Sequence, residues 1–554
     1  MSAAVSSTGR QQDPAPSPSR LPTLEQHSRL RFLLHPLTVI CTVQAVLSLS
    51  LVWSNTAFAD EAQYLSTGEL EWAHWLHGAS VPPYLLKSLS GSPVIYPPLG
   101  ALANSIGGLA GARILSLLFM LGVTIVLYLT ASRLLDRTAA VIASALWALS
   151  EPSVRLAFAT FDPLSILLTA LSAWLIVQAS YRYHRGAFVT AGAVTLALAN
   201  ATAYSGIIID PIVIIFAFLV WLPCMRWRKA SLWMMWFAGI LALLFILLMA
   251  VSGSWAGLMS TVINRGSSDH QSVLLVLSDS WGYSGLIAVL AATGVITAFA
   301  AENRQRAVLL ALLGGTALVV PAAQLHEQTA WSLDKHLAYG IVFAVIAAGY
   351  GCSRLITKVP KAGRKLAASC CVIAFAYPVA TSWASAWSVY HAWPNARSFI
   401  TEFTSEAAHS RGLIYVSETG PENIAEYYTP EGRDTKRWST GLSLDPAIGS
   451  SKTWESYYAS KLSKGNYGVI VLFYTTTFSS KPNLPGEILV SPPKPGLNQE
   501  ILRLEGDNPG EPGLPDLTLA IENDPAYGDQ PKTGPYDSAS ENGFYAIWLE
   551  KPQR

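Results

Sequence analysis

Residues 111–130 read GARILSLLFMLGVTIVLYLT, which is one arginine among nineteen uncharged residues. A helix that crosses a lipid bilayer needs about 20 mostly apolar residues, so this stretch predicts a membrane span over about 110–131. Ten further apolar stretches lie along the chain. The predicted spans are residues 37–57, 110–131, 138–150, 163–180, 187–204, 207–223, 231–252, 280–300, 307–323, 337–353 and 367–388. The sequence therefore predicts a polytopic, all-α membrane protein with about eleven transmembrane helices.

The composition supports this class. The 554 residues are 51% hydrophobic and only 13% charged, with a mean hydropathy of +0.34 and a net charge of +1. A soluble domain carries about 25% charged residues, and a disordered chain is far less apolar. The near-zero net charge provides no electrostatic footprint for nucleic acid, so we expect no nucleic-acid partner.

Lysine and arginine in the short loops predict the orientation, because cytoplasmic loops are enriched in them. If the N-terminus is cytoplasmic, the cytoplasmic loops carry fourteen of these cations and the outer loops carry only Lys87, Arg155, Arg265 and Lys335. An odd number of spans then places the C-terminus outside. We expect a multi-pass protein of a cell membrane, of the bacterial plasma-membrane type, with a cytoplasmic N-terminus and an extracytoplasmic C-terminal domain.

The chain divides into three parts. Residues 1–28 are rich in Ser, Pro and Gln and predict a disordered cytoplasmic arm. Residues 29–389, with a net charge of +8, form the membrane part, whose first outer loop spans 58–109. Residues 390–554, with a net charge of −7, alternate helical patterns with runs such as YGVIVLFY (467–474). They predict a soluble outer domain of α/β or α+β type, with the Pro- and Gly-rich stretch 481–540 as loop.

The sequence contains no recognisable metal or cofactor motif. The five cysteines lie near predicted cytoplasmic ends of spans, and none falls in the outer domain. They predict neither a disulfide nor a metal site. His326 and Glu327 could contribute two ligands to a divalent cation. A bound divalent cation is therefore possible, but the sequence does not predict one. No Gly-rich loop suited to a nucleotide phosphate is present.

Chemistry is predicted at the start of the first outer loop. Asp60 and Glu61 directly follow the first span, where a carboxylate could act as a general base towards a hydroxyl or amine. The alternative is that both acids mark a helix end at the membrane surface. Residues 61–77 carry aromatic residues and leucines at helical spacing and predict an interfacial helix that contains Tyr64.

Two further features lie where this loop returns to the membrane, the YPPLG segment and Arg113. The segment YPPLG (96–100), which begins with Tyr96, predicts a stiff turn. Arg113 then lies just inside the second span, where a cation is costly unless it faces protein, water or an anion. It could bind a phosphate through its planar fork, or its side chain could extend to the surface.

Taken together, the order DEAQY, interfacial helix, YPPLG and GARILSLLFMLGVTIVLYLTASRLLDR resembles the GT-C superfamily of membrane glycosyltransferases. Within that superfamily it is most similar to the protein O-mannosyltransferase and aminoarabinose-transferase branches. The match covers residues 40–180, and the later spans agree in topology. The resemblance implies a GT-C-like helical fold and a polyprenyl-phosphate sugar donor from which a sugar passes, with inversion, to a glycan, lipid or protein acceptor on the outer face.

The resemblance also implies residue roles. Asp60 would be the catalytic base, and Glu61 would contact the acceptor or orient the base. Asp162 matches an acidic residue before the fourth span, although Pro163 replaces the usual small residue. Members often carry a lysine beside the Pro-Pro turn, where this chain has Ile95 and Tyr96.

The missing lysine has candidate replacements elsewhere. Lys335 and His336 open the tenth predicted span from the outer side, and with Arg113 they could neutralise a phosphate leaving group. The alternative is that Asp334 and Lys335 form a solvated ion pair of little consequence.

Two other functional classes remain open. A transporter or flippase of lipid-linked glycans would carry ionisable or helix-breaking residues in mid-span and an internal repeat, and the sequence shows no such repeat. In a scaffold or receptor the outer domain would carry the function, but eleven spans exceed what an anchor needs.

Overall fold

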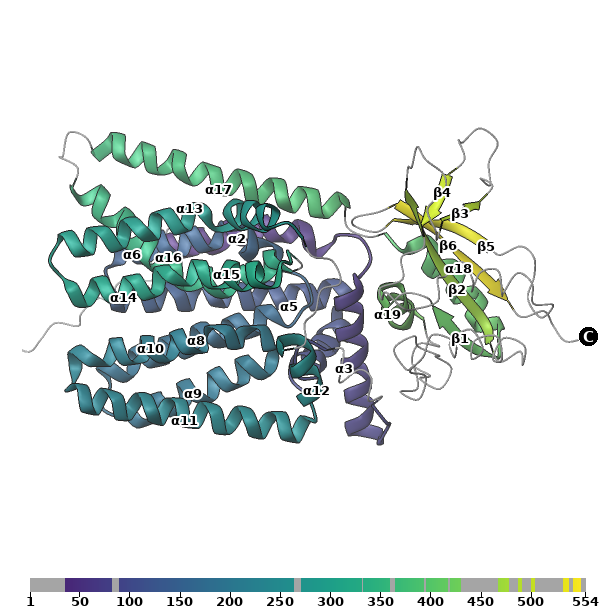
Figure 1. Cartoon of the computed structure of the whole chain (residues 1–554), viewed down its shortest axis with the longest axis horizontal. Helices are drawn as coiled ribbons and strands as arrows, with labels where there is room; N and C mark the ends of the chain where they lie inside the picture. The colour runs from purple at the N-terminus through teal and green to yellow at the C-terminus, as the bar shows by residue number, and fades with distance from the viewer. Residues whose placement is uncertain are drawn as a thin grey trace, which may run out of the picture.

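The structure is a computed structural model with a helical bundle at one end and a mixed sheet with two helices at the other (Figure 1). It describes residues 35–81, 89–263, 271–330, 332–358, 364–392, 395–416, 419–429, 467–477, 487–490, 500–503, 532–537 and 542–549. The predicted disordered arm, residues 1–28, lies outside the described residues.

Helical structure occurs at each of the eleven predicted spans. The helices that occupy the predicted spans are α2 (Pro36–Val52), α5 (Tyr96–Leu134), α6 (Arg137–Ala148), α8 (Asp162–Tyr181), α9 (Arg185–Thr202), α10 (Asp210–Trp221), α11 (Trp227–Ser252), α13 (Val273–Ala300), α14 (Arg304–Gly315), α15 (Val319–Glu327), α16 (Leu333–Lys358) and α17 (Arg364–Ala392). Within the described residues, seven helical segments are long and apolar enough to cross a membrane, while α2 and α6 are shorter apolar helices. The polytopic all-α fold class is confirmed, and the number of spans stays a prediction.

The second span differs from its predicted form. Its helix, α5, begins at Tyr96 rather than near residue 110, because the YPPLG segment is itself helical. Pro97 and Pro98 occupy the first turn, where a missing N–H costs nothing. The helix is kinked at Gly107 and Gly108, and Gly108 has a φ of +60° that a glycine adopts without strain.

The predicted interfacial helix is α3 (Ala59–His77), which runs across the end of the bundle (Figure 1). It packs very closely on the start of α5: a Cβ added at Gly68 would lie 2.0 Å from the carbonyl oxygen of Pro97. The Trp72 indole N–H also donates a hydrogen bond to the Pro98 carbonyl oxygen, at 2.9 Å. These contacts hold the first turn of α3, with Asp60 and Glu61, in a defined place.

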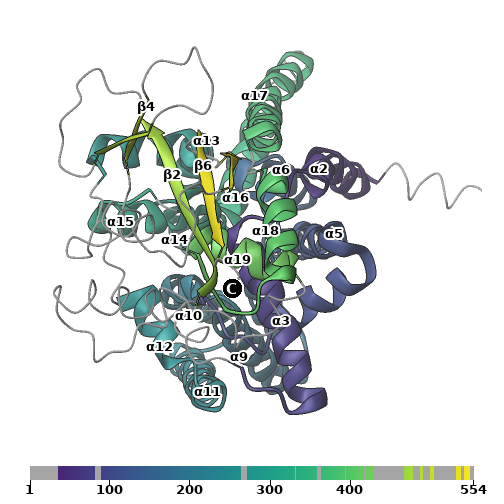
Figure 2. The same ribbon diagram turned by 90° about the vertical axis from the view of Figure 1, so that its right-hand side faces the viewer.

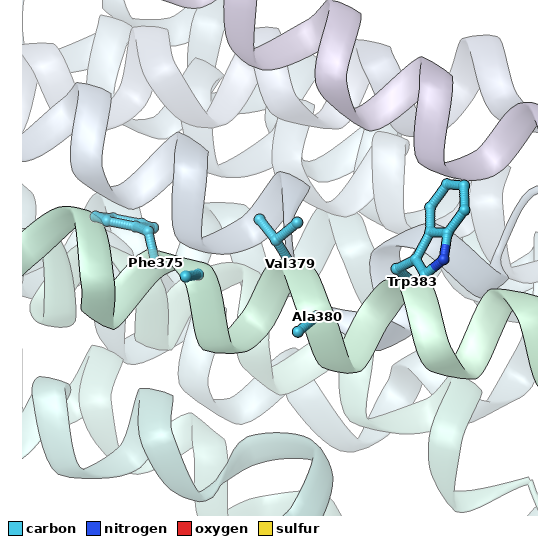
Figure 3. A pocket seen from close by; sticks show the side chains of 5 residues that line it. Phe375, Val379, Ala380 and Trp383 are labelled. Carbon is cyan, nitrogen blue, oxygen red and sulfur yellow. The ribbon is translucent and has the colours of Figure 1, made fainter.

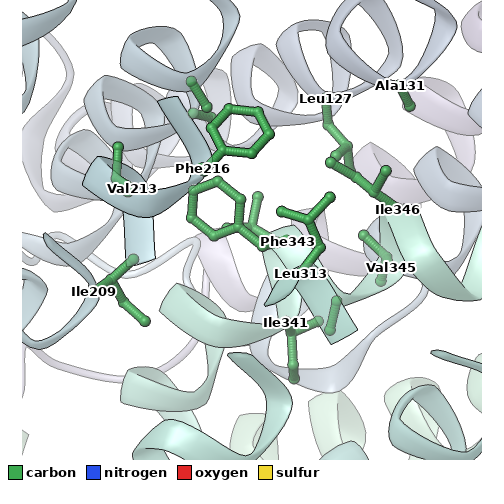
Figure 4. Close-up of a cluster of buried hydrophobic side chains, with 14 of the residues drawn as sticks. Leu127, Ala131, Ile209, Val213, Phe216, Leu313, Ile341, Phe343, Val345 and Ile346 are labelled. Atoms are coloured by element: carbon green, nitrogen blue, oxygen red, sulfur yellow. The ribbon is translucent and has the colours of Figure 1, made fainter. Parts of the chain in front are cut away.

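The bundle core surrounds α16, whose outer half supplies buried aromatic and aliphatic side chains to several neighbours. Phe343 of α16 faces Phe216 of α10, with ring centroids 6.4 Å apart (Figure 4). Lipid tails are as apolar as these side chains, so close packing rather than the hydrophobic effect holds such helices together. The first turn of α16 therefore has a well-defined position at the end of the bundle that faces the C-terminal domain.

The C-terminal part combines helices α18 (Arg397–His409) and α19 (Thr419–Tyr428) with one six-stranded sheet. The strands are β1 (Leu413–Val416), β2 (Tyr467–Thr477), β3 (Glu487–Val490), β4 (Glu500–Arg503), β5 (Lys532–Asp537) and β6 (Asn542–Leu549). Their order is β3-β4-β2-β6-β5, and β1 pairs in parallel with β2 while the other pairs are antiparallel.

Two predictions from the sequence can be compared with the strands of this sheet. The run at 467–474 lies in β2, which pairs with β6, and Val469 lies opposite Leu549. The prediction of loop throughout 481–540 was wrong, because β3, β4 and β5 lie within that stretch. β3 pairs with β4, while β4 and β5 also pair with the longer strands β2 and β6, and this pairing compensates for the many turn-forming residues around them.

The outer domain packs directly onto the membrane part. One buried cluster joins Phe399, Phe403 and Tyr545 of the domain to Ala57 and Ala62 of the first outer loop. Helix α19 lies against α3, as the two views agree (Figures 1 and 2). The outer domain therefore meets the chain at the segment that leads into Asp60 and Glu61.

Candidate active site

An ion pair joins the first turns of two helices at the end of the bundle that faces the C-terminal domain. Lys335 Nζ of α16 lies 3.0 Å from Asp60 Oδ2 of α3. The Asp60 side chain is 35% exposed and that of Lys335 is 22% exposed, so the protein encloses neither of them completely. Asp60 is in the first turn of α3, where the helix dipole favours a negative charge.

A second carboxylate lies close to this pair. Asp162, at the start of α8, is only 5% exposed, and its Oδ1 accepts a hydrogen bond of 3.2 Å from the Tyr339 hydroxyl of α16. Lys335 interacts electrostatically with both Asp60 and Asp162. Lys335 is thus in contact with one carboxylate and under the electrostatic influence of a second.

Tyr339 was not among the residues predicted for the site. A signal for it exists, since it follows Lys335 by four residues and therefore shares its helix face.

The two tyrosines predicted for the site line its inner side. Tyr64 of α3 and Tyr96 of α5 both contact Phe161, with ring centroids 4.1 Å and 5.7 Å from it. Burial, and then the neighbouring Asp60 carboxylate, raise the pKa of the Tyr64 hydroxyl, so it stays protonated at neutral pH. The Tyr96 hydroxyl lies 3.4 Å from Ser116 Oγ. Both rings are buried, so in this structure they support the site from within the protein.

Glu61 faces away from Asp60 and pairs with Arg113. The Arg113 Nε donates to Glu61 Oε1 at 2.8 Å and its Nη2 donates to Oε2 at 2.6 Å, and both side chains are at most 1% exposed. A two-point ion pair of this kind is strong and geometrically specific. Glu61 also accepts hydrogen bonds from the backbone N–H groups of Ala159, at 2.8 Å, and Phe58, at 3.4 Å.

Arg113 uses its remaining donors on the chain segment before α3. Its Nη1 donates to the Ser54 carbonyl oxygen at 3.0 Å and to Ser54 Oγ at 3.1 Å, while Nη2 lies 3.4 Å from the Thr56 carbonyl oxygen. The structure therefore brings Arg113 to Glu61 and to backbone, and brings Lys335 to Asp60. The expected phosphate contact by Arg113 stays a prediction, and it would require the guanidinium to leave these partners.

Asp334 and Lys335 do not pair with each other. Asp334 Oδ2 lies 3.0 Å from Arg155 Nη2, and Arg155 also lies 3.6 Å from Glu151 of the short helix α7 (Glu151–Arg155). Burial raises the pKa of Glu151, which accepts a hydrogen bond from the Ser385 hydroxyl of α17. The solvated Asp334–Lys335 pair considered from the sequence was wrong, because α16 directs the two side chains to different helices. His336 is half-buried on the same turn.

No three His, Cys, Asp or Glu side chains converge as a metal site within the described parts of the chain. His326 and Glu327 end α15, and a divalent cation at them stays an untested idea. A cavity of about 490 Å³ lies along α17 and is lined by hydrocarbon and indole groups at Phe375, Ala376, Val379, Ala380 and Trp383 (Figure 3). It holds no titratable group and is separate from the Asp60–Lys335 pair.

A smaller cavity of about 390 Å³ lies where the outer domain meets the membrane part. It is lined by Asn55, Thr56, Arg397, Ile400, Thr401 and Tyr428.

Comparison with known proteins supports the class that this fold suggests. Residues 94–252 match the sequence model of the dolichyl-phosphate-mannose-protein mannosyltransferase family. No curated protein matches the chain.

Several solved structures resemble the fold. The Archaeoglobus fulgidus oligosaccharyltransferase tethered to an acceptor peptide is 12% identical, with a TM-score of 0.54 over 81% of this chain and 69% of that chain. The same archaeal enzyme, AglB, with an inhibitory peptide and a dolichol-phosphate is 12% identical, with a TM-score of 0.51 over 80% and 69%. ArnT from Cupriavidus metallidurans bound to undecaprenyl phosphate is 13% identical, with a TM-score of 0.49 over 86% and 98%.

The family match over residues 94–252 and the fold shared with the archaeal oligosaccharyltransferase confirm the predicted resemblance: the chain is a multi-pass membrane protein with the GT-C fold, the fold of a superfamily of membrane-embedded glycosyltransferases.

Proposed function

We propose that this protein is an inverting glycosyltransferase that moves a sugar from a polyprenyl phosphate to an acceptor on the outer face of the membrane. The observation that carries the proposal is the Asp60–Lys335 pair, which sets a carboxylate and a cation 3.0 Å apart at the outer end of a GT-C fold. That pairing supplies the two functions the transfer needs, a proton acceptor and a counter-charge for a phosphate. The matched archaeal enzyme has been solved with dolichol-phosphate, a lipid phosphate of the proposed kind.

The proposed reaction is a single displacement. Asp60 accepts the proton of the acceptor hydroxyl or amine as that atom forms a bond to the anomeric carbon. The bond between this carbon and the phosphate oxygen breaks, and its electron pair leaves with the polyprenyl phosphate. Lys335 neutralises the charge that develops on the phosphate. Attack from the face opposite the leaving group inverts the anomeric configuration.

The ion pair of the free protein must open for this reaction. As the donor phosphate arrives, Lys335 exchanges the Asp60 carboxylate for a phosphate oxygen, and Asp60 turns towards the acceptor. Both side chains are partly exposed, so neither must cross a packed core to do so. Asp162, held by Tyr339, keeps Lys335 in place between the two states.

The other predicted site residues take supporting roles in this proposal. Tyr64 and Tyr96 form the buried wall behind Asp60 together with Phe161. His336 is placed one residue beyond Lys335 to bind the donor head group. Glu61 and Arg113 position the start of α3 rather than bind substrate, because both are buried and fully engaged with protein.

The proposed arrangement implies particular partners. The donor enters laterally from the bilayer, and the acceptor is a glycan, lipid or protein that reaches the outer face. The matched archaeal enzyme has been solved with an acceptor peptide, which supports a polypeptide as one possible acceptor. We propose the predicted orientation, with the N-terminus cytoplasmic and the domain from residue 390 extracytoplasmic.

Replacement of the Asp60 carboxylate by an amide tests the proposed glycosyltransferase function. Asp60→Asn retains the size of the side chain but cannot accept a proton, and we expect transfer to fall by about 10²- to 10⁴-fold. Membranes containing the protein are incubated with undecaprenyl phosphates carrying radiolabelled mannose, glucose, arabinose or aminoarabinose, and label in acceptor material is counted. Surface glycans of cells with and without the protein are compared by mass spectrometry.

Glu69→Gln is the matched control, since it makes the same kind of change on the same helix outside the ion pair. Normal transfer by Asp60→Asn would contradict the proposal. Unchanged surface glycans combined with altered movement of lipid-linked sugars across the membrane would favour the transporter alternative.

A further inference from the structure

The segment before α3 is held by side chains from both parts of the protein. The backbone N–H of Ala57 donates a hydrogen bond of 2.8 Å to the Tyr428 hydroxyl oxygen of α19. One residue earlier, Thr56 Oγ1 accepts a hydrogen bond of 3.1 Å from the backbone N–H of Ala396, next to α18. Ala57 is fully buried and Thr56 is 7% exposed, so these donors and acceptors lie where water is scarce.

The membrane part holds the same segment from its other side. Arg113 contacts the carbonyl oxygens of Ser54 and Thr56, and Glu61 receives the N–H of Phe58. Peptide groups between Ser54 and Phe58 are thus held by Arg113 of α5, by Glu61 of α3 and by Tyr428 of the outer domain. Asp60 follows this segment by two residues, so a shift of the segment would move the Asp60 carboxylate relative to Lys335.

The outer domain is also anchored at a second point. The Tyr427 hydroxyl donates a hydrogen bond of 2.8 Å to Asn104 Oδ1 on the first part of α5. Asn104 belongs to α5 and not to the segment that leads into Asp60. Adjacent tyrosines of α19 therefore make two distinct contacts, one to the segment before the base and one to a different helix.

We infer that Tyr428 is a positioning residue for Asp60, through which the outer domain sets the geometry of the reaction. This inference rests on the proposed function. A buried backbone N–H that loses its partner either stays unpaired, at a considerable cost in free energy, or moves to find another partner. A displacement of about 1 Å at a reacting group is enough to reduce the rate strongly.

The test compares two variants that remove the same atom from neighbouring residues. Tyr428→Phe removes the acceptor for the Ala57 N–H, and Tyr427→Phe removes the donor to Asn104. We expect Tyr428→Phe to lower kcat roughly five- to tenfold without changing the donor KM, and Tyr427→Phe to change kcat less than twofold. Binding of undecaprenyl phosphate, measured separately, should be the same for both variants and the wild type.

A double-variant cycle separates positioning from general stability. Asp60→Glu already displaces the base by one methylene group, so adding Tyr428→Phe should cost clearly less than it does in the wild type. Full additivity of the two losses would overturn the inference, as would equal losses in Tyr428→Phe and Tyr427→Phe. Should Tyr428→Phe not accumulate in membranes, Thr56→Val, which removes the acceptor for the Ala396 N–H, takes its place with the same expected split between kcat and KM.

The two proposals fail in different ways. Normal turnover by Asp60→Asn would remove the proposed function. Loss of turnover by Asp60→Asn together with a wild-type kcat for both Tyr428→Phe and Thr56→Val would remove only the role of Tyr428.

Discussion

Lys335 Nζ contacts Asp60 Oδ2 at 3.0 Å although 275 residues separate the two in the chain. Each side chain lies in the first turn of its helix, at the end of the bundle that faces the C-terminal domain. The neighbouring residues behave differently. Glu61 turns to buried Arg113 and Asp334 turns to Arg155. On each of the two helices, adjacent residues of the first turn therefore pair with different partners.

Removal of the Lys335 charge should weaken binding of the donor more than binding of the acceptor. In Lys335→Gln, the donor phosphate loses a charged partner, which is worth about 1.5–3 kcal/mol for one charge-assisted contact. We expect the donor KM to rise roughly ten- to hundredfold, with Lys335→Arg retaining part of the affinity. The donor KM is obtained by measuring the rate of sugar transfer in reconstituted membranes at increasing donor concentrations. The exposed Arg304→Gln is the control, and an unchanged donor KM in Lys335→Gln would refute the assignment.

The buried pair should be more important for folding than for chemistry. Glu61→Gln leaves the Arg113 charge inside the protein without its carboxylate, and a loss of about 3–5 kcal/mol in stability is expected. The double variant with Arg113→Gln removes both charges and should recover part of that loss. Thermal unfolding in detergent measures both. A Glu61→Gln protein as stable as Asp60→Asn would show that the pair is not the structural element described above.

The outer domain should become less stable as the pH rises. Burial, and then the neighbouring Glu426, raise the pKa of Glu422 well above its ordinary value. Folding then requires Glu422 to retain a proton that the unfolded chain releases above about pH 4.3, so this side chain destabilises the fold increasingly as the pH rises towards its folded pKa. Glu422→Gln does not titrate.

We therefore expect Glu422→Gln to be more stable than the wild type at pH 8, with a smaller difference at pH 5. This stability difference is measured from the unfolding midpoints of the full-length wild type and variant between pH 5 and pH 8. Glu402→Gln, on the exposed face of α18, should show an offset that does not change with pH. A Glu422→Gln offset that is constant with pH would contradict the expectation.

The orientation can be tested by labelling from one side. In a cysteine-free chain, Thr401→Cys on α18 should react with a membrane-impermeant maleimide in intact cells, because we place the outer domain outside. Arg304→Cys, in a predicted cytoplasmic loop, should react only after the membrane is opened. The reverse pattern would put Asp60 on the cytoplasmic side and contradict the proposed site.

Much of the architecture could be predicted from local patterns. Apolar runs of span length led to the helices, and the aromatic spacing of residues 61–77 led to α3, because burial in lipid leaves a strong signal in composition. The Pro-Pro segment was the main local error, since prolines are compatible with the first turn of a helix as well as with a turn. The strands at 487–490, 500–503 and 532–537 escaped prediction because pairing with distant strands outweighed weak local preference.

By itself, the sequence determined that this chain enters the membrane many times, where its first outer loop lies and that an Asp–Glu pair opens that loop. Those features follow from hydrophobicity and spacing, which depend on near neighbours. Only the tertiary structure decided which acid meets which cation, since Asp60 and Glu61 are adjacent yet point to α16 and α5 respectively. A helix places consecutive side chains about 100° apart, so the packing around α3, including Tyr428 from the outer domain, decides their partners.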